Sequence, residues 1–269
     1  MTENISALSM AAVAYSFVSI GIVLQKKGIF WIGWKGLKDK TYYKHLAVWL
    51  SGFLLMNLYG IPSAIALKSL PPHQVSAFAG WGVIVLVFLS KFFLKDVLFR
   101  SDYFYSLVVI AGIVMLNLSG NPVAGSEISL TVLTLLYFFF PVFLFILSLL
   151  TKFNNKIVNV LTAVVSGCTA GLMVISLKGL IGLHGYRITE YPASIYFYLY
   201  LFFALISFLS LQMSLKTGPV LITGQLQYSS TIIYPVAGSL IVFSGKTGLF
   251  QIISIVIIVI GVIRILKNR

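Results

Sequence analysis

The most polar stretch of this hydrophobic chain lies near its carboxyl end and consists of uncharged hydrogen-bonding side chains. Its polar members are Thr223, Gln225, Gln227, Tyr228, Ser229, Ser230, Thr231 and Tyr234. Gln225, Tyr228 and Thr231 are spaced three residues apart and therefore share one face of a helix. Amides and hydroxyls both donate and accept hydrogen bonds. The pattern predicts a surface that binds a neutral or zwitterionic organic solute.

Two other hydrophobic runs carry residues that suit the same kind of site. One contributes an amide and a phenol, and the other contributes two aromatic rings on which a solute can stack. The complete set of predicted substrate-binding residues is Asn57, Tyr59, Phe78, Trp81, Gln225, Gln227, Tyr228 and Thr231. Polar side chains on apolar helices also join neighbouring helices by hydrogen bonds. Packing therefore stays open as the alternative role of each residue.

No acidic residue falls in the middle of a hydrophobic run. The six acids are Glu3, Asp39, Asp96, Asp102, Glu127 and Glu190. All of them are predicted to lie in loops or at helix ends. The three histidines lack ligand spacing, the single cysteine stands alone, and the sequence has no HExxH helix or GxSxG turn. Enzymes that work inside membranes need such grouped side chains, so we expect no enzyme, no metal site and no cofactor.

The composition determines which elements must position these residues. The chain is 59% hydrophobic and only 9% charged, whereas a soluble domain carries about 25% charged residues. It is therefore expected to be an all-α integral membrane protein, in which about 20 apolar residues form each spanning helix. About nine such runs are present, near 5–24, 46–67, 73–94, 103–119, 128–151, 157–177, 193–213, 220–243 and 249–266. Pro62, Pro141 and Pro235 fall inside these runs and can mark breaks or hinges.

The basic residues predict the orientation. Most of the 19 lysines and arginines fall on one side of the expected membrane, and cytoplasmic loops carry such an excess. This predicts a multi-pass cell-membrane protein with an extracellular amino end and a cytoplasmic carboxyl end. Topology thus accounts for the net charge of +13 without a nucleic-acid partner. Lys27, Lys68, Lys178 and Lys216 are interpreted as residues that extend to lipid headgroups, with attraction of anions as the alternative.

Short motifs repeat along the chain in the same order. VLQKKG (23–28) is echoed by ISLKG (175–179), and ALKSLPP (66–72) is echoed by SLKTGP (214–219). A glycine-containing helix then closes each half, with Gly112 in the first and Gly261 in the second. The order of the motifs indicates an internal repeat.

The repeat predicts one transmembrane domain over residues 1–269. Repeat 1 covers 5–119, a linking helix covers 128–151, and repeat 2 covers 157–266. Because four helices return the chain to its starting side, the linking helix inverts the second repeat. Inverted repeats are typical of secondary transporters, which bind their substrate near the middle of the membrane.

The repeated motifs also resemble the drug/metabolite transporter superfamily. The segment ALKSLPPHQVSAFAGWGVIVLVFLSKFFLKDVL (66–98) is similar to the ALKxIP…AY…W…G…GE pattern of small multidrug resistance proteins, with Asp96 at the usual place of a glutamate. In this resemblance Phe78 and Trp81 stand for substrate-facing aromatic residues. The ending VLQKKGIF (23–30) resembles the NIPA-like magnesium transporters. EamA-like proteins share the inverted-repeat organisation that the resemblance implies.

The chain departs from these families where they carry intramembrane acids. The first helix has no acid near Val18 and Ser19, and the second helix reads FLLMNLYGIP (53–62) where NIPA-like proteins have a glutamate. Magnesium prefers hard oxygen ligands, usually including a carboxylate. The missing acids therefore disfavour dedicated magnesium transport and proton-coupled export of lipophilic cations.

These observations favour a secondary transporter that moves a small polar or zwitterionic metabolite by alternating access. The alternatives are a NIPA-like magnesium or divalent-cation transporter, a flippase for lipids or lipid-linked sugars, and a non-transporting membrane subunit. The expected partners are a small-molecule solute and the lipid bilayer. Association into a homodimer is a further possibility that the sequence leaves open.

Overall fold

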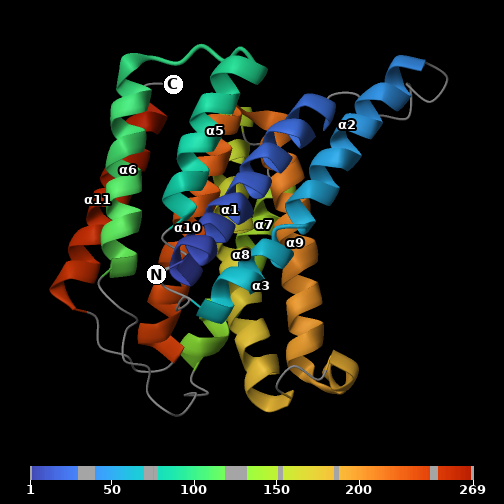
Figure 1. Cartoon of the computed structure of the whole chain (residues 1–269), viewed down its shortest axis with the longest axis vertical. Coiled ribbons are helices and arrows are strands. Elements are labelled where there is room, and N and C mark those ends of the chain that lie inside the picture. Colours follow the sequence, from blue (N-terminus) through green and yellow to red (C-terminus); the bar gives the residue numbers. More distant parts are fainter. Residues whose placement is uncertain are drawn as a thin grey trace. The chain divides into compact units, whose positions relative to one another are not determined.

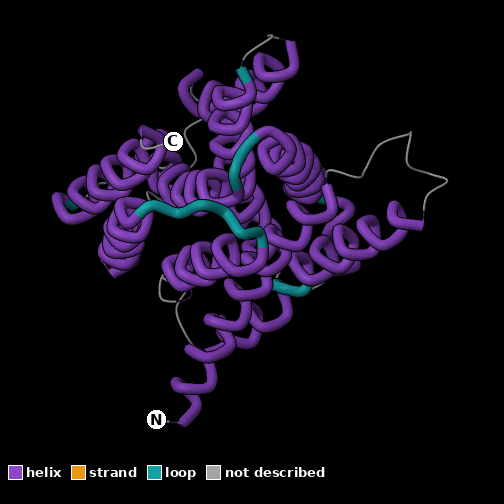
Figure 2. The backbone as a smooth tube through the Cα atoms, turned by 90° about the horizontal axis from the view of Figure 1, so that it is seen from above, coloured by secondary structure: helices purple, strands orange, loops and turns teal. Residues whose placement is uncertain are grey.

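A computed structural model describes residues 2–29, 40–69, 75, 78–118, 132–150, 154–184, 188–242 and 248–267. The regular structure in these ranges is entirely helical, without a strand (Figure 2). Every hydrophobic run that the sequence marked as a spanning segment contains an α-helix. The expected all-helical fold is confirmed for the described part of the chain.

The helices, which Figure 1 labels, belong to two compact units, and each unit is described by itself. The helices of the first unit are α1 (Thr2–Ile29), α2 (Lys40–Asn57), α3 (Gly60–Ser69), α5 (Ala79–Phe93), α6 (Arg100–Leu118) and α11 (Leu249–Lys267). Those of the second are α7 (Val132–Leu150), α8 (Asn155–His184), the 3-10 helix η2 (Ile188–Ala193) and α9 (Ile195–Thr217). Helix α10 (Val220–Val242) belongs to the first unit up to Gln225 and to the second from Leu226 onward.

Five helical segments in the described ranges are long and apolar enough to cross a membrane. They are Ile5–Ile29, Tyr42–Ser63, Asn155–Met173, Ile195–Thr217 and Leu249–Lys267. Two shorter apolar helices cover Ala79–Phe93 and Phe138–Leu150. This agrees with the expected multi-pass membrane protein.

Several predicted helix boundaries were wrong. Helix α2 begins at Lys40 rather than near residue 46, α5 begins at Ala79 rather than near residue 73, and α9 ends at Thr217 rather than near residue 213. The first and sixth helices were expected to end near residues 24 and 177, but α1 continues to Ile29 and α8 to His184. Lys26 and Lys27 thus lie in the last turn of α1. Lysine forms helices well, and its positive charge stabilises the negative end of the helix dipole. A lysine pair after an apolar run therefore does not mark a loop.

The second predicted helix is broken. Helix α2 ends at Asn57, a turn follows at Leu58 and Tyr59, and α3 begins at Gly60. Pro62 has no N–H with which to bond the carbonyl of Leu58, and the N–H of Ile61 bonds that carbonyl at 3.1 Å instead. In contrast, α7 and α10 continue through their prolines, Pro141 and Pro235.

Glycines bring α1 and α2 into close contact in the first unit. A Cβ atom at Gly52 would lie 2.7 Å from the carbonyl oxygen of Gly21, and one at Gly28 would lie 2.6 Å from the Cβ of Trp49. Without water to exclude between them, helices in a bilayer associate by such close packing. The close packing of α1 against α2 therefore requires glycine at these positions, because any larger side chain would overlap the other helix.

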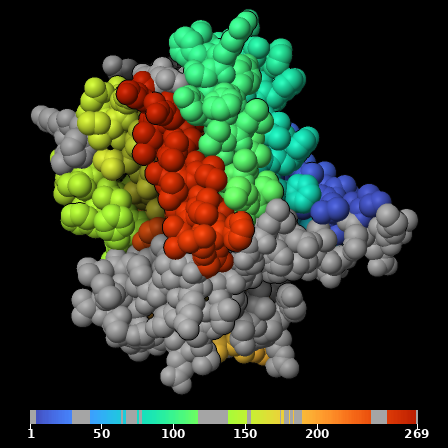
Figure 3. Space-filling model, turned by 90° about the vertical axis from the view of Figure 1, so that its left-hand side faces the viewer, coloured from blue at the N-terminus to red at the C-terminus, as the bar shows by residue number. Residues whose placement is uncertain are grey.

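Helices α6 and α11 also lie side by side in the first unit (Figures 1 and 3). A Cβ at Gly112 would lie 2.6 Å from Ile258, and one at Gly261 would lie 2.7 Å from Val109. The two glycines that close the predicted repeats thus make room for side chains of the neighbouring helix. Gly112 of α6 contacts Ile258 of α11, and Gly261 of α11 contacts Val109 of α6. Helix α11 turns a row of large apolar side chains outward, namely Leu249, Phe250, Ile252, Ile253, Val256, Val259, Ile260 and Ile263.

Polar side chains join α8 and α9 in the second unit. The amide of Asn159 donates to the carbonyl of Ser214 at 2.8 Å and to its hydroxyl at 2.9 Å, and the hydroxyl of Ser207 donates to the carbonyl of Ser166 at 2.9 Å. These pairs recur after seven residues on both helices, which keeps them on one seam. Here the structure supports the packing role of intramembrane polar residues.

Candidate functional site

The first half of α10 consists of buried residues, of which 220–225 belong to the first unit and 226–229 to the second. Every residue from Val220 to Ser229 is buried, including Thr223, Gln225 and Gln227. A helix that faces lipid exposes one apolar side, whereas a helix enclosed by protein does not. The polar residues from Thr223 to Ser229 are therefore buried, whereas those from Ser230 to Tyr234 are partly exposed.

Gln225 links α10 to α6 within the first unit. Its side chain is 1% exposed, and its Nε2 donates to the hydroxyl of Ser106 at 2.5 Å. The hydroxyl of Ser106 donates to the carbonyl of Asp102 at 2.6 Å. The Oε1 atom of Gln225 accepts no hydrogen bond from the described protein atoms. Leaving such a group without a partner costs about 1–3 kcal/mol.

The other predicted residues of α10 lie in the second unit. Gln227 and Tyr228 are each 5% exposed. The Oε1 atom of Gln227 and the hydroxyl of Ser229 lack partners among the described residues. Thr231 donates to the carbonyl of Gln227 at 2.8 Å, so its hydroxyl is turned toward its own helix. Buried amide oxygens without partners thus occur twice on α10.

The aromatic candidates of the first unit contact α1. Tyr59 meets the ring of Tyr15 edge to face, with centroids 5.5 Å apart. Trp81 is 44% exposed, and its Nε1 donates to the hydroxyl of Ser16 at 3.0 Å. Neighbouring residues of α1 therefore hold both rings, although neither Tyr15 nor Ser16 was a predicted site residue.

The remaining two candidates have local contacts. Asn57 is exposed, and its Nδ2 donates to the carbonyl of Phe53 at 2.8 Å, within its own helix. Phe78 packs against a cluster formed by Ala7, Ala11, Ala66 and Val75. The contacts of Asn57 and Phe78 thus explain their positions by hydrogen bonding at the end of α2 and by packing.

Asp102 stands at a helix end, as expected, but it is fully buried. Its Oδ2 accepts a hydrogen bond from the backbone N–H of Phe99 at 3.0 Å, in the first turn of α6. An acid at this position of a helix satisfies an otherwise unpaired N–H and favours the helix dipole. Sequence periodicity could not reveal its burial, nor the role of Ser106 between Asp102 and Gln225.

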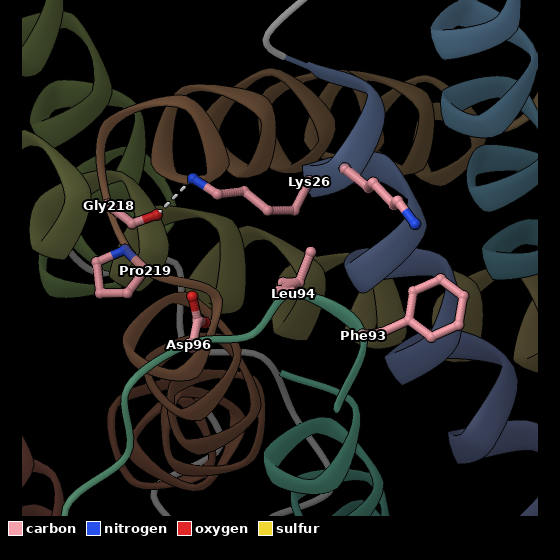
Figure 4. Close-up of a pocket in the computed structure, with 7 residues that line it drawn as sticks. Lys26, Phe93, Leu94, Asp96, Gly218 and Pro219 are labelled. Atoms are coloured by element: carbon pink, nitrogen blue, oxygen red, sulfur yellow. Dashed lines mark hydrogen bonds between the residues drawn. The ribbon is translucent and has the colours of Figure 1, made fainter. Parts of the chain in front are cut away.

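A cavity of about 470 Å³ lies where α1, α5 and α10 have their ends in the first unit (Figure 4). Its lining residues are Lys26, Lys27, Phe93, Leu94, Asp96, Gly218 and Pro219. The ammonium of Lys26 donates to the carbonyl of Gly218 at 2.8 Å. Lys27 was expected to extend toward headgroups, and no role was predicted for Lys26, so the bond of Lys26 to Gly218 is a feature that sequence reasoning missed.

No family model, curated protein or solved structure matches this chain. The binding chemistry of the candidate site is therefore inferred from the side chains of this chain alone. The described residues contain no group of three or more His, Cys, Asp and Glu side chains that could hold a metal ion. They offer uncharged amides and hydroxyls along α10, and two ammonium groups and a carboxylate around the cavity. Such groups bind a solute by hydrogen bonds and by charge.

The cavity and the buried amide share one helix. Pro219 lines the cavity at the start of α10, and Gln225 follows six residues later. With a rise of about 1.5 Å per residue, the two positions are about 9 Å apart along the helix. The charged cavity thus lies at the end of the helix that carries the polar interior.

Proposed function

We propose that this protein is a secondary transporter, which moves a small polar or zwitterionic metabolite across a membrane by alternating access. The observation that carries the proposal is the buried first half of α10, in which the Oε1 atom of Gln225 has no partner among the described residues. An unpaired buried polar group is costly and calls for a functional explanation. A solute that passes along α10 and donates a hydrogen bond supplies one.

The proposal includes nine spans arranged as two inverted repeats, with an extracellular amino end and a cytoplasmic carboxyl end. The helix in each predicted span and the glycine contacts of α6 and α11 support this arrangement. The excess of basic residues on one side supports the orientation.

Labelling of single cysteines tests the orientation. In a Cys168→Ala background, a membrane-impermeant maleimide added outside intact cells should label Ser6→Cys and leave Lys267→Cys unlabelled. Ser6 and Lys267 are both exposed in the structure, so both react once the membrane is opened. Labelling of both positions from the outside would contradict an odd number of spans.

Uptake into proteoliposomes tests transport itself. Vesicles containing the purified protein should accumulate at least one solute from a panel of amino acids and other polar metabolites, with saturable kinetics. Empty vesicles are the control. Uptake of Mg²⁺ alone would favour the divalent-cation alternative, and movement of a labelled lipid alone would favour a flippase. No uptake of any panel member would contradict the proposed function.

A further inference from the structure

The cavity at the ends of α1, α5 and α10 brings together both signs of charge. Two ammonium groups, from Lys26 and Lys27, and one carboxylate, from Asp96, line it. The carboxylate of Asp96 is directed toward the turn that carries Gly218 and Pro219 (Figure 4). The excess of one positive charge disfavours cationic solutes. It favours a solute with a negative group and a net charge of zero or minus one.

The two lysines have different surroundings. Lys26 is half-buried, donates to the carbonyl of Gly218 at 2.8 Å and is attracted by Asp96. These contacts hold Lys26 against the start of α10. Lys27 is exposed, and its Nζ lies 4.5 Å from the centre of the Phe93 ring. A contact with a ring face is weak at an exposed position, so Lys27 can exchange it for an oxyanion.

Asp96 supplies the opposite charge. It is half-buried in the segment after α5, and its backbone N–H donates to the carbonyl of Ser90 at 3.0 Å. A carboxylate accepts several hydrogen bonds at once, so Asp96 can interact with Lys26 and still accept from a ligand. The cavity therefore is lined both by ammonium groups, which donate hydrogen bonds, and by a carboxylate, which accepts them.

We infer that this cavity binds a zwitterion of the amino-acid type, whose carboxylate contacts Lys27 and whose ammonium contacts Asp96. The inference rests on the proposed function, because it names the solute class and the residues that first receive the solute. The volume of about 470 Å³ lies within the range of about 300–1,000 Å³ that is usual for small-molecule sites. The site is separate from the predicted residues Gln225 and Tyr228 further along α10.

Binding to the purified full-length protein in detergent tests this assignment. Titration with each standard L-amino acid should identify one that binds. Its carboxamide, which lacks the carboxylate, and its N-acetyl derivative, which lacks the ammonium, should each bind at least about 10-fold more weakly. Lys27→Gln should make the amino acid and its carboxamide bind equally. Asp96→Asn should make the amino acid and its N-acetyl derivative bind equally.

Lys91→Gln is the matched control. Lys91 is an exposed lysine of the same unit whose Nζ lies 5.6 Å from the centre of the Phe92 ring, but it does not line the cavity. This variant should bind like the wild type, and Lys27→Arg should retain binding because it keeps the charge. Unchanged discrimination in Lys27→Gln and Asp96→Asn, or no binding of any amino acid, would overturn the inference.

The two proposals fail in different assays. If a solute is taken up and its binding is unchanged by Lys27→Gln and Asp96→Asn, the zwitterion site is overturned and the proposed transport function stands. Binding that depends on Lys27 and Asp96, without uptake of any solute into vesicles, would keep the site and overturn the transporter.

Discussion

Replacing Gln225 by leucine is expected to reduce transport by at least about 10-fold while the melting temperature stays the same or rises. The Nε2 of Gln225 donates to Ser106, but the hydroxyl of Ser106 keeps its own bond to the carbonyl of Asp102. The substitution also removes a buried Oε1 atom that has no partner among the described residues. Replacing a poorly paired buried polar group by an apolar one of similar shape is often neutral or stabilising. A transport loss of about 10-fold corresponds to about 1.4 kcal/mol of lost stabilisation of the transported solute.

A second buried glutamine of the same unit provides the control. Gln251 is 4% exposed, and its Oε1 accepts from the backbone N–H of Gly248 at 3.3 Å, just before α11. Glutamine at this position caps the start of a helix, and loss of a cap costs about 0.5–2 kcal/mol. Gln251→Leu should therefore lower the melting temperature and leave transport per folded molecule unchanged.

Comparison of the two leucine variants separates function from packing. Uptake is measured in proteoliposomes and unfolding is measured in detergent. If Gln225→Leu lowers the melting temperature as Gln251→Leu does and transports normally, Gln225 serves packing. The replacement of Gln225 and Tyr228 by alanine should abolish uptake in the same assay without loss of folding.

Adding a single methyl group at Gly52 is expected to destabilise the protein by about 1–3 kcal/mol, the usual cost of overpacking. A Cβ there would lie 2.7 Å from the carbonyl oxygen of Gly21 and 2.8 Å from the backbone nitrogen of Gln25. Both are backbone atoms that no rotamer change can move. Helices α1 and α2 must therefore separate in Gly52→Ala, and thermal unfolding in detergent measures the loss.

Gly60→Ala is the matched control for this effect. A Cβ at Gly60, the first residue of α3, meets nothing within 4 Å. Alanine restricts the unfolded chain more than glycine and favours the helix by about 0.5–1 kcal/mol. Gly60→Ala should thus unfold at the same or a higher temperature. Equal melting temperatures for the two variants would show that α1 and α2 do not depend on close contact at Gly52.

The sequence predicted where the helices lie because each needs a long apolar run, and composition alone reveals such runs. It did not predict the ends of α1 and α8, because lysines that follow an apolar run continue the helix there. The break after Asn57 could be suspected from Pro62. Pro141 and Pro235 give the same signal inside helices that stay continuous. A proline therefore marks where a break can occur, and its surroundings decide whether it does.

From the sequence, candidate site residues could be grouped only when they lie on the same helix. The polarity of α10 was visible in the sequence, but its burial was not predicted, because the low charge of the chain indicates membrane helices without telling which of them are enclosed. The bond between Lys26 and Gly218 joins residues 192 positions apart, and the bond between Gln225 and Ser106 joins residues 119 positions apart. Such pairs arise from how helices pack, and no local pattern encodes them. The bond of Asn57 to the carbonyl of Phe53, by contrast, is local and follows from the end of α2 at Asn57, which apolar periodicity did not predict.

The interruption between α2 and α3 also bears on the surrounding bilayer. Hydrocarbon chains offer no partners to backbone N–H and carbonyl groups, so a helix break is tolerated at membrane depth only where the chain pairs them itself. Across this turn the N–H groups of Leu58, Tyr59, Ile61 and Ser63 bond the carbonyls of Leu54, Met56, Leu58 and Tyr59. The turn also exposes an apolar side chain, because Leu58 is 45% exposed. Acyl chains can therefore lie against this turn, and the break does not require the membrane to thin around it.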